Sequence, residues 1–106
     1  MKNKNILIIF GTRPEAIKMS PIINKINNSK NIGVNLKVCV TGQHRELLDQ
    51  VLELFHIHPD YDLKVMKDNQ DLTELTVRLI SKIKEVISAF NLPIELVIID
   101  LTANNN

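Results

Sequence analysis

Apolar residues are distributed along the chain in two alternating patterns. Short apolar runs with little polar alternation are typical of strands buried on both faces of a parallel sheet. Longer segments with apolar residues every three or four positions are typical of helices packed along one side. The first pattern predicts strands over Asn5–Phe10, Val34–Val40 and Ile94–Ile99, and the second predicts helices over 14–26, His44–Phe55 and Asp71–Phe90.

The expected strands and helices follow one another in strict alternation. Between the last two helices, Tyr61–Met66 alternates apolar and polar residues, which predicts a short strand or an extended link. Pro21 lies inside the first helical pattern, so we expect a kink or a division of that helix. Such alternation predicts an α/β fold, in which right-handed crossovers give a Rossmann-like parallel sheet flanked by helices.

Composition and charge restrict the class of protein. The 106 residues are enough for one domain, and 13 basic against 12 acidic residues give a net charge of +1. This balance gives no electrostatic support for a nucleic-acid or acidic-membrane partner. No apolar run reaches the roughly 18 residues that a membrane span needs. The single cysteine, Cys39, cannot form a disulfide within the chain, which favours a cytoplasmic protein. Its place in a strand pattern favours a buried thiol.

The turn after the first strand is the strongest candidate for ligand binding. Backbone N–H groups at a helix start attract an anion, and Arg13 could hold a phosphate through two parallel hydrogen bonds. Lys18, further along the helix, could point into the same cleft. Under the alternative interpretation, Gly11 begins a tight turn, Glu15 complements the helix dipole and both cations lie in solvent. The turn has neither a dinucleotide-binding nor a Walker A pattern.

A second polar loop, Thr41–Glu46, stands at the equivalent position after the second strand. His44 in this loop could hydrogen-bond a ligand or transfer a proton, the alternative being a helix cap with a solvated face. Asp71, followed by Glu74 three residues later, is a helix-capping pattern. Gln70, immediately before it, could still reach a ligand.

His56 and His58 lie where the second helix is expected to end, with Asp60 and Asp62 nearby. Their spacing matches no standard metal-ligand pattern, and no cysteine contributes. We therefore expect no metal site there. A histidine close to a helix C-terminus interacts favourably with the helix dipole.

The last residues, from Asp100 to Asn106, end in three asparagines. This stretch predicts neither a helix nor a strand, whereas ligands in such sheets bind just beyond the carboxyl ends of the strands. A four-stranded half-sheet would also leave an exposed edge. We therefore expect the chain to be a fragment of a larger protein.

Four stretches together resemble the non-hydrolysing UDP-N-acetylglucosamine 2-epimerases. They are residues 11–21 (GTRPEAIKMSP), 41–50 (TGQHRELLDQ), 59–63 (PDYDL) and 70–72 (Gln-x-Leu). The resemblance extends from about Ile6 to Ile99. It implies a GT-B-type enzyme of two Rossmann-like domains with the active site between them. Residues 1–106 would form part of the N-terminal domain, and the second domain would be absent.

The resemblance also implies an activity. Members of the family interconvert UDP-N-acetylglucosamine and UDP-N-acetylmannosamine by eliminating UDP to a glycal intermediate and adding it back after inversion at C2. They need neither nicotinamide nor a required metal, so no cofactor is expected. The product feeds surface polysaccharides, and full-length members are typically homodimers.

The resemblance also implies roles for individual residues. Arg13 and Lys18 stand at substrate-binding positions, and Gln43, His44 and Gln70 resemble residues that line a second, regulatory UDP-N-acetylglucosamine site. Where the family continues with a Gly-Asp-Thr-type loop that carries a candidate catalytic aspartate, this chain reads Asp-Leu-Thr-Ala from residue 100. Asp100 approximates that aspartate only with a shifted register, so the chain alone is expected to be inactive.

Two other interpretations remain open at this stage. The chain could be a non-catalytic remnant that binds nucleotide sugars weakly, because half a site lacks the desolvation and orientation that its partner domain would provide. It could also be a generic flavodoxin-like binding module, although the length of the four matching stretches argues against this.

Overall fold

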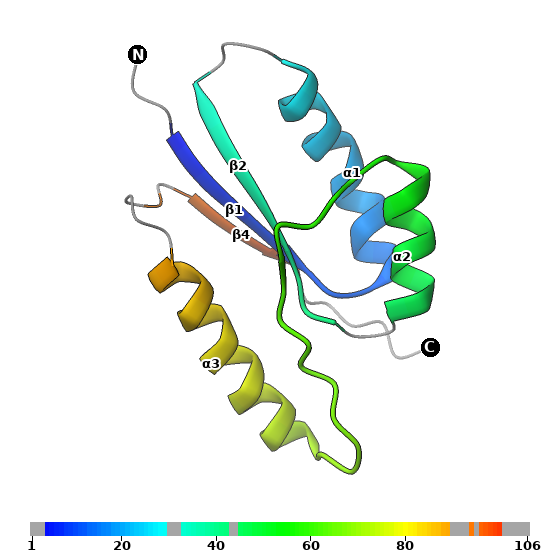
Figure 1. Cartoon of the computed structure of the whole chain (residues 1–106), viewed down its shortest axis with the longest axis vertical. Coiled ribbons are helices and arrows are strands. Elements are labelled where there is room, and N and C mark those ends of the chain that lie inside the picture. Colours follow the sequence, from blue (N-terminus) through cyan, green and yellow to red (C-terminus); the bar gives the residue numbers. More distant parts are fainter. Residues whose placement is uncertain (1–3, 30–32, 43–44, 90–93, 95, 101–106) are drawn as a thin grey trace.

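The computed structural model describes residues 4–29, 33–42, 45–89, 94 and 96–100. Within these residues the chain forms a parallel sheet with the strand order β3-β2-β1-β4 and helices on both faces (Figure 1). The elements follow in the order β1 (Lys4–Phe10), α1 (Arg13–Asn28), β2 (Val34–Val40), α2 (Arg45–Leu54), β3 (Tyr61–Asp62), α3 (Leu72–Ala89) and β4 (Leu96–Asp100).

The predicted Rossmann-like α/β architecture is confirmed. Each expected strand and helix is found within a few residues of its predicted bounds. The ambiguous stretch from Tyr61 forms a two-residue strand, after which the chain is irregular, with Lys64 in the left-handed conformation at a φ of +50°. The central strand β1 is buried on both faces, and its residues from Leu7 to Phe10 have no exposed surface. A continuous apolar run therefore marks the middle of the sheet, as expected.

The core is divided by the sheet into two layers. Ile8 and Phe10 face α1 and α2, whereas Leu7 and Ile9 face α3, because successive strand residues point to opposite faces. Figure 1 shows α1 and α2 together on one side of the sheet and α3 on the other. The helices contribute Ala16, Met19, Ile23, Leu48, Val51 and Leu52 to the first layer and Leu75, Leu79, Ile83 and Val86 to the second.

The proline inside α1 does not divide the helix. Of the two expected outcomes, a kink or a division, the division does not occur, since the helix runs without interruption from Arg13 to Asn28. Pro21 and Ile17 are both exposed, so water can reach the Ile17 carbonyl that the proline cannot satisfy. One residue earlier, the hydroxyl of Ser20 donates to the carbonyl of Ala16 at 2.5 Å, a further contact within the same turn.

Two leucines expected in apolar helix faces are exposed to solvent, one largely and the other about half. Leu72 is 78% exposed because it is the first residue of α3, whose N-terminal end extends beyond the sheet in Figure 1. Leu47 is 49% exposed, while Leu48, the next residue of α2, is fully buried. Phe90, expected at the end of the third apolar face, lies outside the described residues.

His56 takes part in the hydrogen bonds that end α2. His56 has a φ of +57°, the left-handed conformation that commonly ends a helix. Its N–H donates to the Glu53 carbonyl at 3.1 Å, and the N–H of Ile57 donates to the Leu52 carbonyl at 2.8 Å. Leu52 and Ile57 are both buried in the core. This pair of reversed hydrogen bonds is a Schellman motif, with histidine in the position that glycine usually occupies.

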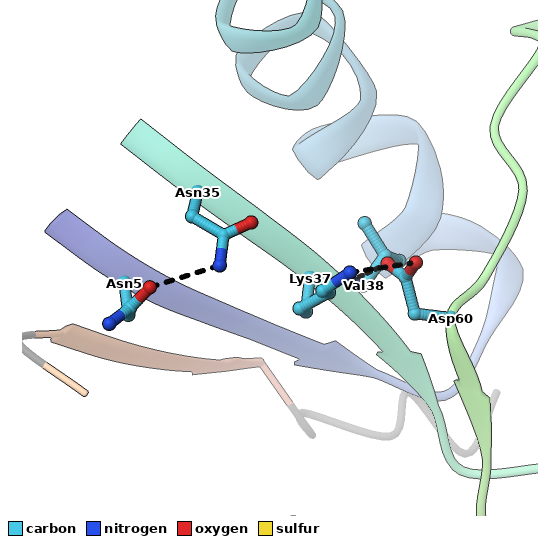
Figure 2. A network of polar contacts seen from close by, with 5 residues as sticks. All are labelled: Asn5, Asn35, Lys37, Val38 and Asp60. Carbon is cyan, nitrogen blue, oxygen red and sulfur yellow. Dashed lines mark hydrogen bonds and ion pairs between the residues drawn. The ribbon is translucent and has the colours of Figure 1, made fainter. Parts of the chain in front are cut away.

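Polar side chains join neighbouring strands on either side of β2 (Figure 2). Asn35 donates to the side-chain oxygen of Asn5 at 3.0 Å, between β2 and β1. Immediately before β3, Asp60 bonds the backbone of Val38 twice. Its N–H donates to the Val38 carbonyl at 2.7 Å, and its Oδ2 accepts the Val38 N–H at 2.8 Å. Its other oxygen lies 3.9 Å from the Lys37 ammonium. Asp60 thus extends the short β2–β3 pairing by one residue.

The thiol of Cys39 is expected to be chemically inert in the folded chain. Cys39 is completely buried in the layer facing α3, and burial raises its pKa from 9.0 to about 12. Labelling by a thiol-specific reagent at pH 8–9 should therefore proceed at the rate of unfolding and accelerate strongly in urea. Because the unfolded chain loses the thiol proton near pH 9 and the folded chain does not, stability should fall between pH 9 and about 12. Rapid labelling of the native chain would contradict the expected inertness of the Cys39 thiol.

Candidate functional site

The carboxyl ends of the parallel strands meet at one edge of the sheet (Figure 1). The strand register aligns the last residues of β3, β2, β1 and β4 in one row, in the order Asp62, Val40, Phe10 and Asp100. The loops after β1 and β2 therefore start from adjacent points. This edge is where an open α/β sheet binds its ligands.

The turn after β1 is tightly built. Gly11 and Thr12 are buried, and Thr12 is the extended N-cap residue of α1. The Thr12 carbonyl accepts the N–H of Ala16 at 3.0 Å, which is the first bond of the helix. Arg13 is the first helical residue and is exposed, so its side chain stands at the edge of the sheet and is open to solvent.

Glu15 has a larger structural role than its sequence pattern predicts. Its side chain is 1% exposed, and Oε1 accepts hydrogen bonds from the N–H groups of Gly11 at 2.9 Å and Thr12 at 3.0 Å. The expectation that Glu15 complements the helix dipole is confirmed, but the carboxylate does so from inside the turn. The threonine at position 12 with a glutamate three residues later is a capping-box pattern that could have predicted these contacts.

Arg13 and Lys18 are both exposed residues of α1. They are five positions apart, which places their side chains roughly 140° apart around a regular helix. A single ligand would therefore contact them from two directions. Their convergence on one cleft remains a prediction.

The loop after β2 begins with two residues that are fixed by neighbouring chain segments. The N–H of Thr41 donates to the Phe10 carbonyl at 3.0 Å, and its carbonyl accepts the N–H of Val65 at 3.0 Å. Gly42 has a φ of +92° and packs directly against the backbone of Lys64. Gln43 and His44, which follow, lie outside the described residues.

Gln70 is held close to this second loop. Its side-chain nitrogen donates to the Val65 carbonyl at 2.9 Å, and Val65 in turn bonds Thr41. Its Oε1 is buried and has no hydrogen-bond partner among the described residues. The adjacent Asp71 caps α3 as predicted, because its Oδ1 accepts the N–H of Glu74 at 2.8 Å.

Asp100 is the last residue of β4 and lies beside Phe10 in the register. Its backbone is therefore at the same edge as the turn that carries Arg13, while its side chain lies outside the described part of the structure. In the described ranges, no group of three or more histidine, cysteine, aspartate or glutamate residues is arranged to hold a metal ion. None of the helices described is long and apolar enough to cross a membrane.

A separate groove of about 320 Å³ lies between β3 and α3. It is lined by cations and anions together, including Lys64, Arg78, Lys82, Asp62 and Glu85. Lys82 pairs with Glu85 at 3.6 Å, so part of this charge is already neutralised within the chain. The groove contains neither Arg13 nor Lys18, and we do not assign the candidate site to it.

Comparison with known proteins now decides the family. Residues 24–102 match the family model described as UDP-N-acetylglucosamine 2-epimerase. The chain is 52% identical over 99 residues to the UDP-N-acetylglucosamine 2-epimerase of Campylobacter jejuni and 50% identical over 97 residues to that of Escherichia coli K12. These alignments cover 93% and 92% of the chain. The chain belongs to the UDP-N-acetylglucosamine 2-epimerase family.

Solved structures of epimerases share its fold. The Neisseria meningitidis UDP-GlcNAc 2-epimerase bound to UDP-GlcNAc matches 90% of the chain with a TM-score of 0.77 and 47% sequence identity. The S. aureus MnaA–UDP complex matches 80% with a TM-score of 0.69 and 45% identity. The chain covers 25% and 21% of these two structures, and it spans about a quarter of the length of the C. jejuni and E. coli epimerases.

Proposed function

We propose that this chain supplies part of the N-terminal, Rossmann-like domain of a UDP-N-acetylglucosamine 2-epimerase. In this role it contacts the diphosphate of UDP-N-acetylglucosamine at the turn after β1, through Arg13 and Lys18. The observation that carries the proposal is the likeness, at 47% identity and a TM-score of 0.77, to an epimerase bound to UDP-GlcNAc. The position of Arg13, the first residue of α1 and close to the carboxyl end of β1, supports it further.

The reaction proposed for the whole enzyme converts UDP-N-acetylglucosamine to UDP-N-acetylmannosamine. Elimination breaks the bond between the anomeric carbon and UDP and removes the C2 proton, which gives a glycal. Re-addition of UDP and delivery of a proton to the opposite face complete the inversion. Arg13 and Lys18 would stabilise the charge that develops on departing UDP. Asp100 is a candidate for proton transfer, on the ground that its backbone lies beside the same turn.

A second ligand site is proposed around the loop after β2. Gln43, His44 and Gln70 would line a regulatory UDP-N-acetylglucosamine site there. The hydrogen bonds that link Gln70 to Val65, and Val65 to Thr41, support grouping Gln70 with that loop. A bound ligand can also satisfy the buried Oε1 of Gln70.

The wider context of the enzyme is also proposed. We infer a GT-B arrangement of two domains, a homodimer, a cytoplasmic location and a role in making surface polysaccharides. The chain spans about a quarter of the length of its relatives, which favours ligand binding without turnover by the 106 residues alone. In that form it would act as a nucleotide-sugar-binding half-site.

Replacing Arg13 by alanine tests the substrate-binding proposal. The variant should bind UDP about tenfold more weakly, because a charge-assisted, bidentate contact to phosphate is lost. Titration of the 106-residue chain with UDP, followed by NMR, measures this, and separate samples supplied with UDP-N-acetylglucosamine can be assayed for formation of UDP-N-acetylmannosamine. Lys25→Ala is the matched control, since Lys25 is an exposed cation in the last turn of the same helix. Equal UDP affinity in the wild type and Arg13→Ala would refute the proposal.

A further inference from the structure

The N-terminus of α1 already holds an anion that belongs to the chain itself. Four N–H groups at the start of a helix have no partner within that helix, and they commonly bind phosphate. In α1 the N–H of Thr12, at the N-cap, is one of these groups, and Pro14 has no N–H to offer. The N–H of Thr12 and that of Gly11, in the turn just before the helix, both donate to Oε1 of Glu15. The carboxylate is 1% exposed, so it is built into the turn.

We propose that Glu15 is a positioning residue that occupies this phosphate-binding position, so that the diphosphate is held by cationic side chains and not by the turn's N–H groups. The inference rests on the proposed function, because it concerns how the same ligand is held. Glu15 acts through its neighbours. It fixes the backbone of Gly11 and Thr12, and thereby the position from which the Arg13 side chain extends.

Charge and exposure support this division of roles. A phosphate bound at the N–H groups of Gly11 and Thr12 would have to displace a buried carboxylate or lie against it, and like charges in contact repel. Arg13 follows Thr12 directly and is exposed. The ligand's phosphates are therefore directed outward, toward side chains that can adjust their position.

This arrangement suits a leaving group that must depart and return. Backbone N–H groups fixed in a turn would hold UDP in one place, whereas long cationic side chains can follow it over a short distance.

Two buried atoms in the turn, Oε2 of Glu15 and the hydroxyl oxygen of Thr12, have no hydrogen-bond partner among the described residues. Within the described residues, the Glu15 carboxylate therefore accepts its hydrogen bonds through Oε1 alone, from the N–H groups of Gly11 and Thr12.

Inorganic phosphate is the probe for the test, and affinity is measured at constant ionic strength by thermal shift and by NMR. Glu15→Ala should bind phosphate roughly threefold to tenfold more tightly than the wild type, because the N-terminus of α1 becomes accessible. Glu15→Gln should gain less, since its amide oxygen still accepts the two hydrogen bonds. Glu74→Ala, at an exposed glutamate in the first turn of α3, should leave phosphate affinity unchanged.

Two outcomes would overturn the inference. Equal phosphate affinity in Glu15→Ala and the wild type would show that the N–H groups are not being kept from the ligand. Equal gains in phosphate affinity in Glu15→Ala and Glu15→Gln would show that the gain comes from removing the negative charge of Glu15 and not from freeing the two N–H groups. A purely structural role for Glu15 predicts no gain in affinity from either variant.

A second measurement needs no variant, and it applies if Glu15→Ala does not fold. In the wild type, saturating phosphate should leave the amide resonances of Gly11 and Thr12 in place and shift the side-chain resonance of Arg13. Movement of the two amides would refute the inference. Failure of the proposed function would appear separately, as UDP binding that survives Arg13→Ala.

Discussion

Substitution of Gly42 by alanine is expected to lower the free energy of unfolding by about 2–4 kcal/mol. Gly42 has a φ of +92°, where a side chain is strained. A Cβ at this position would lie 2.8 Å from the Cα of Lys64 and 3.0 Å from its nitrogen. Both atoms belong to the backbone, so no side-chain rotation can relieve the contact. The link after β3 would have to move away from the β2 loop.

Urea unfolding followed by far-UV circular dichroism measures this effect. Gly33→Ala is the control, because Gly33 also has a positive φ, at +73°. Gly33 lies just before β2, the strand after which Gly42 stands. We expect the control to lose only the backbone term, about 1 kcal/mol. Equal losses in the two variants would mean that the contact with Lys64 contributes nothing.

Truncation of Phe10 to alanine should be more damaging, with a loss of about 3–5 kcal/mol. Phe10 is fully buried in the layer under α1 and α2 and ends the central strand. A cavity there removes contacts from two helices at once. Since domains of this size are stable by about 5–15 kcal/mol, the loss is a large share of the total. The variant should unfold at a much lower urea concentration.

Leu54→Ala provides the comparison for this truncation. Leu54 is 72% exposed at the end of α2, so its removal should change stability by less than about 0.5 kcal/mol. If Leu54→Ala were as destabilising as Phe10→Ala, burial in this core would not be the source of the stability. Both variants can be followed by the same circular dichroism signal.

The sheet and its helices could be predicted because their residues carry local patterns. The run from Ile6 to Phe10 is apolar without interruption, and only a strand covered on both faces suits such a run. The cap at Asp71 could also be predicted, since a capping pattern lies within four residues of sequence. Pro21 was harder to interpret, because its effect depends on which side of α1 faces water.

The features that sequence reasoning missed depend on contacts between distant segments or on unusual residue choices. Nothing near Gly42 in the sequence reveals that Lys64 crosses it. His56 adopts a left-handed conformation that a pattern-based reading assigns to glycine or asparagine. The burial of Glu15 was within reach of prediction, but an acidic residue in the first turn of a helix is more often placed in solvent.

The asparagine pair at the amino ends of β1 and β2 has a consequence for how the strands find their alignment. Asn5 is 3% exposed and pairs with Asn35 in the register of β1 and β2. Sliding one strand by two residues would keep every side chain on its own face, so apolar packing alone discriminates weakly against it. It would, however, place Asn5 opposite Gly33 or Lys37 and separate the two amides, at a cost of about 1–3 kcal/mol. The amide pair at one end of the strands therefore helps to determine which residues stand side by side at the other.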